Sequence, residues 1–270
     1  MSDTLEIPRD RWKRPLIIPP DGGAPVAYTR VSTLAKALDD LNNLMAWRQR
    51  KTAEGLLRRP DLLTRLSGAV ATGDPDADWP TKRELNAICD EACEAAAASK
   101  GASAGTGLHS LTEAIDRGQE PLFMSDTDRA LLEDYRAATA DLEPLDIECF
   151  VVNDTLQAAG TFDRLYRCPD GRVMVADLKT GKSEHEYPLA SCVQIATYAN
   201  GLRYDPESGA RSPLHADLDL TTGLLVHLPL SGGCTVIPLD LTKGWEAAQA
   251  AAGVRQIRAW KAADLIRGAA

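Results

Sequence analysis

The chain lacks any hydrophobic run approaching the roughly 18 residues that a membrane-spanning helix requires. Its first ten residues, MSDTLEIPRD, lack the basic and apolar segments of a secretion signal. These two absences predict a cytoplasmic protein with no membrane partner.

Several motifs that mark common enzyme classes are also missing. The sequence contains no Walker phosphate-binding loop, no dinucleotide-binding glycine fingerprint and no Ser, His and Asp set typical of a hydrolase triad. The six cysteines are scattered, and no second pair follows Cys89 and Cys93. Because zinc and iron–sulfur sites usually take paired clusters, we expect reduced, mostly buried thiols.

What the chain does have is an ordinary composition and an uneven charge. With 270 residues, 44% hydrophobic and 26% charged, it can bury the core of one large domain or two small ones. The net charge of −9 divides into +4 for residues 1–60, −13 for 61–158 and zero for 159–270. The acidic total disfavours tight nonspecific binding to nucleic acid, but the two ends could still form a basic surface. The acidic middle is otherwise an ordinary solvated face.

The order of predicted elements indicates an α/β fold. Pro and Gly residues make 1–30 an irregular arm, and Ser32 or Thr33 could cap the first helix. Periodicity predicts helices over 32–51, 54–70, 81–100, 103–117, 126–141 and 188–203 and after Thr242, and strands over 146–152, 156–167, 172–179, 224–230 and 234–241. We expect an arm (1–30), a helical region (31–143) and an α/β core (144–270), the last two as one compact unit with a central mixed sheet flanked by helices.

Two carboxylates stand out in the segment AAGTFDRLYRCPDGRVMVADLKTGK (158–182). Suppose that PDG (169–171) is a three-residue hairpin loop with Gly171 at positive φ. The numbers of two directly paired residues then sum to 340, so Asp163 faces Asp177. Facing like charges destabilise a sheet, so a bridging Mg²⁺ or Mn²⁺ would explain them. Lys179, on the same face, could then hold or activate an attacking water. The alternative is a surface hairpin with a Lys–Asp pair, or a register shifted by one.

Four motifs in this order resemble the PD-(D/E)XK nuclease superfamily. GTFD (160–163) and DLK (177–179) resemble its core signature. GTGLH (105–109) looks like the G-x-x-x-H helix of the RecB-like branch, which includes phage exonucleases, and QIATY (194–198) looks like its Q-x-x-x-Y motif. The resemblance implies the superfamily's restriction-endonuclease-like α/β core.

The resemblance also implies roles for particular residues. His109, Asp163, Asp177 and the Leu178 backbone carbonyl would be metal ligands, and Lys179 would position the water. Gln194 and Tyr198 lie on one helical face and would support the site or touch the DNA backbone. Glu148 is an additional candidate acid. His109 and Tyr198 could instead be ordinary core residues.

Some relatives hold an iron–sulfur cluster on one Cys before the core and three after it. Only Cys234 follows Cys192 here, so we expect no such cluster.

We therefore expect a Mg²⁺- or Mn²⁺-dependent DNA exonuclease of bacterial or phage recombination, repair or replication, acting on linear ends, with a recombination protein as a candidate partner. The alternatives are an endonuclease and a non-catalytic DNA- or protein-binding module. Candidate phosphate contacts are Arg48, Arg50, Lys51, Arg58, Arg59 and Lys182.

Overall fold

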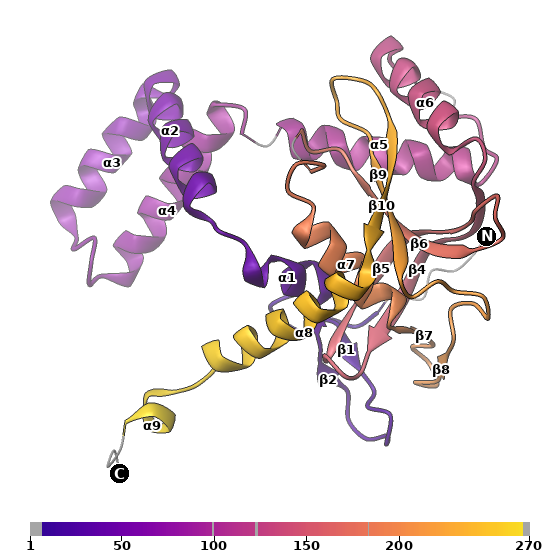
Figure 1. Cartoon of the computed structure of the whole chain (residues 1–270). Coiled ribbons are helices and arrows are strands. Elements are labelled where there is room, and N and C mark those ends of the chain that lie inside the picture. Colours follow the sequence, from indigo (N-terminus) through magenta and orange to yellow (C-terminus); the bar gives the residue numbers. More distant parts are fainter. Residues whose placement is uncertain (1–6, 99, 122–123, 183, 267–270) are drawn as a thin grey trace. The chain divides into compact units, whose positions relative to one another are not determined.

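The computed structural model describes residues 7–98, 100–121, 124–182 and 184–266, and its chain is traced in Figure 1. The chain packs as two compact units. The larger comprises the residues up to Asp39 and those from Leu108 onward, and the smaller comprises Asp40–Gly107. The domain limits at 30/31 and 143/144 stay a prediction.

The larger unit is built on a mixed sheet of eight strands. Its order is β10-β9-β6-β5-β4-β7-β8, with β3 beside β5. The pairs β6/β9 and β3/β5 are parallel, and the others are antiparallel. The strands are β3 Thr29–Arg30, β4 Glu143–Asn153, β5 Ala158–Arg167, β6 Val173–Lys179, β7 Leu202–Tyr204, β8 Arg211–Ser212, β9 Thr222–His227 and β10 Thr235–Asp240.

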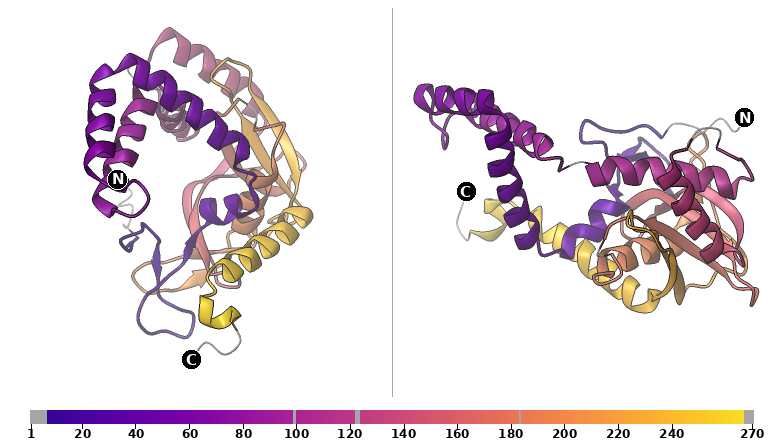
Figure 2. Two further views of the ribbon diagram at one scale, coloured as in Figure 1. Left: turned by 90° about the vertical axis from the view of Figure 1, so that its left-hand side faces the viewer. Right: turned by 90° about the horizontal axis from the view of Figure 1, so that it is seen from above.

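Helices cover both faces of this sheet. One core cluster joins α1 (Val31–Ala35), α7 (Leu189–Ala199) and α8 (Leu241–Arg258) to side chains such as Phe162 and Val175. A second joins α5 (Lys100–Asp116) and α6 (Asp126–Thr139) to the opposite face, through Tyr166 and Met174. Figure 2 shows the two groups of helices from two further directions. The predicted fold class, a central mixed sheet flanked by helices, is therefore confirmed.

The hairpin between β5 and β6 has the predicted register. Its printed pairs run from Arg167↔Val173 to Arg164↔Ala176, so paired numbers sum to 340. Gly171 has a φ of +85°, and the Cys168 amide donates to the Arg172 carbonyl at 2.9 Å. The ladder stops one residue before Asp163 and Asp177, which leaves both carboxylates just beyond its last pair.

The helix predicted over 32–51 is wrong. The structure has α1, a short 3-10 turn (η1, Lys36–Leu38) and then α2 (Asn42–Arg58), with Asp39 extended between them. Asp is a poor helix former, and the consecutive Asp39 and Asp40 interrupt the helix where the apolar periodicity continues. Leu44 and Met45 are more than half exposed, whereas Leu34 is buried, so these residues do not share one buried helical face.

Other element limits also differ from the prediction. The helix expected over 54–70 is divided, because α2 ends at Arg58 and α3 (Pro60–Thr72) begins with a proline that cannot continue the preceding hydrogen bonds. The helix expected over 188–203 ends at Ala199, and the chain turns into β7. The arm, expected to be irregular, contains the strands β1 (Leu16–Ile17) and β2 (Val26–Ala27).

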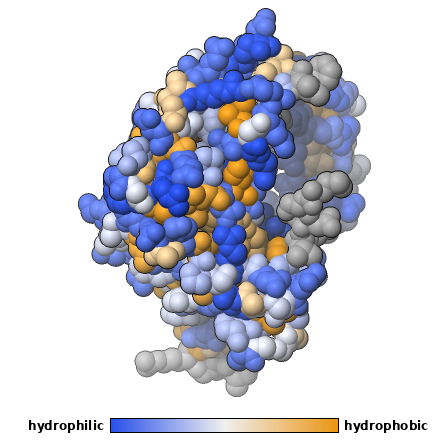
Figure 3. Space-filling view, turned by 90° about the vertical axis from the view of Figure 1, so that its right-hand side faces the viewer, coloured by the Kyte–Doolittle hydropathy of each residue, from blue (hydrophilic) through white to orange (hydrophobic). Residues whose placement is uncertain are grey.

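All six cysteines are free thiols, but only Cys93 and Cys149 are buried and the other four are partly exposed, so the expectation of mostly buried thiols is wrong. In the described part of the chain, no helix is long and apolar enough to cross a bilayer. Figure 3 shows one face of the molecule, on which hydrophilic residues dominate and hydrophobic ones reach the surface in smaller groups.

The smaller unit depends on a close contact between α2 and α4 (Trp79–Ala95). Its core contains Leu62, Ile88 and Ala92, the first of them from α3. A Cβ placed on Gly55 would lie 1.7 Å from the Ala92 carbonyl oxygen. Only a residue without a side chain therefore lets these two helix backbones approach each other.

We expect Gly55→Ala to destabilise the protein by about 1–3 kcal/mol, because a rigid backbone must move to admit the methyl group. Gly68→Ala is the matched control, since Gly68 lies inside α3 with open space around its Cβ position. That change should stabilise the protein by about 0.5–1 kcal/mol. Urea unfolding of both variants measures the difference, and equal effects would contradict the close packing.

Candidate active site

The alternation of side chains along β5 breaks at Asp163. Leu165 lies in the core cluster with α7 and α8, whereas Arg164 and Tyr166 point to α5 on the other face. Regular alternation would place Phe162 with Arg164, but Phe162 lies in the cluster with Leu165. An irregularity of this kind re-aims a side chain, and here it turns Asp163 toward α5.

Glu148 lies on β4 opposite this break. The pairs Ile147↔Arg164 and Cys149↔Phe162 flank it, and its own φ is +57°, which is uncommon for a residue other than glycine. Burial and the nearby carboxylate of Glu113 raise the pKa of Glu148. The strand irregularity therefore places a third acid beside the predicted pair.

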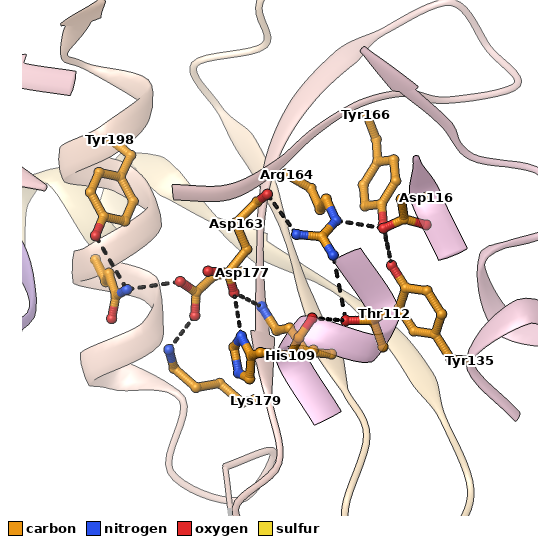
Figure 4. Close-up of polar contacts among 12 residues, drawn as sticks. His109, Thr112, Asp116, Tyr135, Asp163, Arg164, Tyr166, Asp177, Lys179 and Tyr198 are labelled. Atoms are coloured by element: carbon orange, nitrogen blue, oxygen red, sulfur yellow. Dashed lines mark hydrogen bonds and ion pairs between the residues drawn. The ribbon is translucent and has the colours of Figure 1, made fainter. Parts of the chain in front are cut away.

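Asp163 is held between a backbone amide and a histidine. Its Oδ2 accepts a hydrogen bond from the Leu178 amide at 2.7 Å and lies 3.5 Å from His109 Nδ1 (Figure 4). Burial and the charge of Asp177 raise the pKa of Asp163 well above its ordinary value. Burial also lowers the pKa of His109, which favours the neutral imidazole that a metal requires.

Asp177 is buried, with 1% of its side chain exposed, and has two polar partners. Lys179 Nζ donates to Oδ2, and Gln194 Nε2 donates to Oδ1 at 2.8 Å. Gln194 Nε2 also lies 3.5 Å from the Tyr198 hydroxyl, so the face of α7 predicted from sequence borders the carboxylate. Burial acts to lower the pKa of Lys179, but the attraction of Asp177 outweighs it and the pKa is raised. Lys179 is therefore a cation in this arrangement.

A comparison with protein families agrees with this geometry. The model of the PD-(D/E)XK nuclease superfamily matches residues 61–233, more than half of the chain. The chain belongs to the PD-(D/E)XK nuclease superfamily. No curated protein matches it. The superfamily predicted from the four motifs is confirmed, and membership indicates a nuclease with DNA as the expected substrate, whereas the RecB-like branch stays a prediction.

The buried arginine beside Asp163 in this nuclease was missed by sequence reasoning. Arg164 donates from Nε to Asp116 Oδ2, from Nη1 to the Asp163 carbonyl at 2.8 Å and from Nη2 to Thr112 Oγ1 at 3.4 Å. The Thr112 hydroxyl in turn donates to the His109 carbonyl at 2.9 Å. Arg164 thereby fastens the His109 turn of α5 to the strand that carries Asp163.

Two tyrosines complete this buried network. Tyr135 of α6 donates to Asp116 Oδ2 at 2.5 Å, and the hydroxyls of Tyr135 and Tyr166 lie 2.7 Å apart. The only signal in the sequence is the spacing of His109, Thr112 and Asp116, which puts them along one side of a helix. Because the Asp116 carboxylate receives Arg164 and the Tyr135 hydroxyl, and the Tyr166 hydroxyl contacts that of Tyr135, α5, α6 and β5 are held in a single relative position.

A second missed residue lies beyond Lys179. His227 of β9 pairs with Lys179 in the ladder, and its Nε2 lies 2.7 Å from the Gly181 carbonyl oxygen. Sequence reasoning assigned this histidine no role. Its contact fixes the backbone at Gly181, two residues after Lys179, where the chain leaves the site.

Most of the predicted phosphate contacts already have acidic partners. Arg48 pairs with Asp90, Lys51 and Arg58 pair with Glu54, and Arg59 pairs with Asp61. Within the described residues, Arg50 and Lys182 form no ion pair. A DNA phosphate would therefore compete with a carboxylate at four of the six positions, and their role as contacts stays a prediction.

The donor chemistry of the site fits a hard divalent cation. PD-(D/E)XK nucleases generally use divalent metals such as Mg²⁺, which prefer carboxylate oxygens. Asp163 and Asp177 are two such donors, their negative charges repel each other, and a cation would remove that repulsion. In the described part of the chain, no three His, Cys, Asp or Glu side chains are already gathered as a metal site. Lys179 contacts one oxygen of Asp177.

The raised pKa of Asp163 predicts that the stability of the metal-free protein depends on pH. The folded chain keeps a proton that the unfolded chain releases above about pH 4, so the free energy of unfolding falls as the pH rises beyond that value. Asp163→Asn keeps an acceptor for the Leu178 amide and removes this titration. The melting temperature of the variant minus that of the parent, measured in EDTA, should therefore increase from pH 5 to pH 9. A difference that stays constant over this range would refute the raised pKa.

Proposed function

We propose that this nuclease is a Mg²⁺- or Mn²⁺-dependent deoxyribonuclease of the RecB-like type, an exonuclease that hydrolyses phosphodiester bonds from the ends of linear DNA. The observation that carries the proposal is the convergence of the buried Asp177 and the partly exposed Asp163 on neighbouring strands, with Lys179 and His109 against them. We place its work in bacterial or phage recombination, repair or replication. A cytoplasmic location, the lack of an iron–sulfur cluster and a recombination protein as partner belong to the same proposal.

Each residue of the site has a separate task in this proposal. Asp163, Asp177, His109 and the Leu178 carbonyl would hold the cation, with Glu148 as an additional acid. A bound divalent cation supplies positive charge that stabilises the charge developing on the phosphate oxygens. The raised pKa of Lys179 suits a charged group that orients the attacking water and contacts a phosphate oxygen, rather than a group that removes a proton.

The amide of Gln194 keeps Asp177 in a fixed orientation. The Gln194 Nε2 contact to Oδ1 leaves Oδ2 for Lys179, so the carboxylate presents one oxygen to each neighbour. Gln194 also lies beside the buried Tyr198 hydroxyl, whose ring packs edge-on against Phe162 at 6.2 Å between centroids. Tyr198 thus supports the amide that orients the acid.

The central test is cleavage of DNA with and without metal. Linear DNA should be degraded with Mg²⁺ or Mn²⁺ and remain intact in excess EDTA, and Asp177→Asn and Lys179→Ala should each lower the rate at least about a hundredfold. Asp170→Asn is the matched control, because Asp170 lies exposed at the far end of the same hairpin and should leave the rate unchanged.

The form of the DNA separates the remaining alternatives. Degradation of linear but not covalently closed circular DNA supports an exonuclease, whereas cutting of the closed circle would make the protein an endonuclease. Binding without any cleavage would leave a non-catalytic module. Parental rates in both variants would show that the residues are assigned wrongly.

A direct measurement of metal binding tests His109. His109→Ala should weaken Mn²⁺ binding about tenfold or more, because one nitrogen donor is lost from a site with few ligands. The effect on Mg²⁺ should be smaller, since Mg²⁺ prefers oxygen. Calorimetric titration of both ions into parent and variant gives the affinities, and His215→Ala, a histidine outside the site, is the control. Equal Mn²⁺ affinity of parent and His109→Ala would mean that His109 only packs.

A further inference from the structure

The N-terminal arm of the larger unit carries a tight hairpin that the proposed site does not use. Arg9 and Pro15 form an antiparallel bridge, and the Asp10 amide donates to the Arg14 carbonyl at 3.0 Å. Asp10 Oδ1 accepts from the amides of Trp12 and Arg14 at 3.0 and 2.8 Å. The hairpin therefore has a defined backbone conformation, held from within by Asp10.

The hairpin is also fixed to the body of the unit. Pro15 is buried, and Ile17, immediately beyond it, is fully buried in a cluster with Tyr28 and Val152. Ile7, on the other side of the hairpin, packs against the same cluster. The tip thus projects from an anchored base and keeps its position relative to the sheet.

The tip presents cations around an exposed aromatic ring. Trp12 is 58% exposed, and the guanidinium carbons of Arg11 and Arg14 lie 3.9 and 5.0 Å from the centre of its ring. Asp10, the acid of the tip, is already occupied by Arg14. Arg11 and Lys13 are exposed and form no ion pair with any described residue. The tip therefore combines several positively charged side chains with an exposed aromatic ring that offers a surface for stacking.

A second element of the same unit adds to this charge. Burial lowers the pKa of Arg255 near the end of α8, and the charges of Arg258 and Arg14 lower it further. Cations from the two ends of the chain therefore lie close enough to repel one another. Such crowding costs stability in the free protein, and an anionic partner would relieve it.

We propose that this hairpin is a nucleic-acid contact in addition to the active site, which binds a single DNA strand through Arg11, Trp12 and Lys13. The cations would bind successive phosphates, and an unstacked base would add to the Arg11–Trp12 stack. A duplex does not offer the face of a base, so the stack favours single-stranded DNA. The inference rests on the proposed function, since it takes the substrate to be DNA.

Fluorescence anisotropy in EDTA, with a labelled oligothymidine of about 20 nucleotides, tests the contact without cleavage. Trp12→Ala should weaken binding about tenfold, whereas Trp12→Phe should retain most of the affinity. Arg11→Gln should reduce the slope of log K against log salt by about 0.7, the value for one phosphate contact on a single strand. Lys13→Asn should do the same, because Asn tolerates the positive φ of 62° at that position.

Arg136→Gln is the matched control. Arg136 is an exposed arginine of α6 in the same unit, paired with Glu120, and its change should leave the affinity as it is. If the parent binds and cuts DNA but Trp12→Ala, Arg11→Gln and Lys13→Asn bind as the control does, the inference is wrong and the proposed function stands. If the parent neither binds nor cuts DNA, both fail. Parental binding to vesicles of phosphatidylcholine and phosphatidylserine that the variants lose, with DNA binding unchanged, would assign the hairpin to membranes and overturn the inference.

Discussion

Two carboxyl groups, the buried Asp177 and the partly exposed Asp163, lie side by side on adjacent strands, and much of the larger unit is arranged around them. Water cannot screen their repulsion there, so each needs a fixed partner. The Leu178 amide serves one acid, and Lys179 and Gln194 serve the other. Even so, burial and, after it, the charge of Asp177 raise the pKa of Asp163, so these partners do not fully offset the cost of holding both acids there. A positive charge added beside the pair would lower that cost.

This constraint explains why a second buried ionic network lies next to the first. Arg164 follows Asp163 in the chain, and because the alternation breaks at Asp163 both side chains lie toward α5, where Asp116 neutralises Arg164. Its contacts to Thr112 and the Asp163 carbonyl join α5 to β5. A buried pair of this kind contributes little net stability, but it specifies one orientation. Here the orientation that it specifies brings His109 to the acid.

The parts of the fold that were predictable from sequence are those set by local rules. The Pro169-Asp170-Gly171 loop fixes the hairpin register, and the register alone places Asp163 near Asp177. His109 is far from both in sequence and was found through a motif, since an imidazole on an Ala- and Leu-rich helix resembles a core residue. Arg164 could not be found, because an arginine in a strand is ordinarily at the surface and its burial depends on Asp116. The prediction of a helix over 32–51 is wrong for the opposite reason. The apolar periodicity continues through Asp39 and Asp40, but the helical backbone is interrupted there.

The connection between β5 and β6 also bears on the order in which the unit forms. The two strands are neighbours in sequence joined by a short loop, so their pairing is a local contact that can form early, in about 1–10 μs for an isolated hairpin. At that stage both carboxylates are still hydrated. The residues that enclose them come from α5 and α7, and β6 must wait for α7 before it meets its parallel neighbour β9. We therefore expect Asp163 and Asp177 to lose their water at a late step of folding, when α5 and α7 pack against the sheet. That packing step, and not the pairing of β5 with β6, is the one that the two acids oppose.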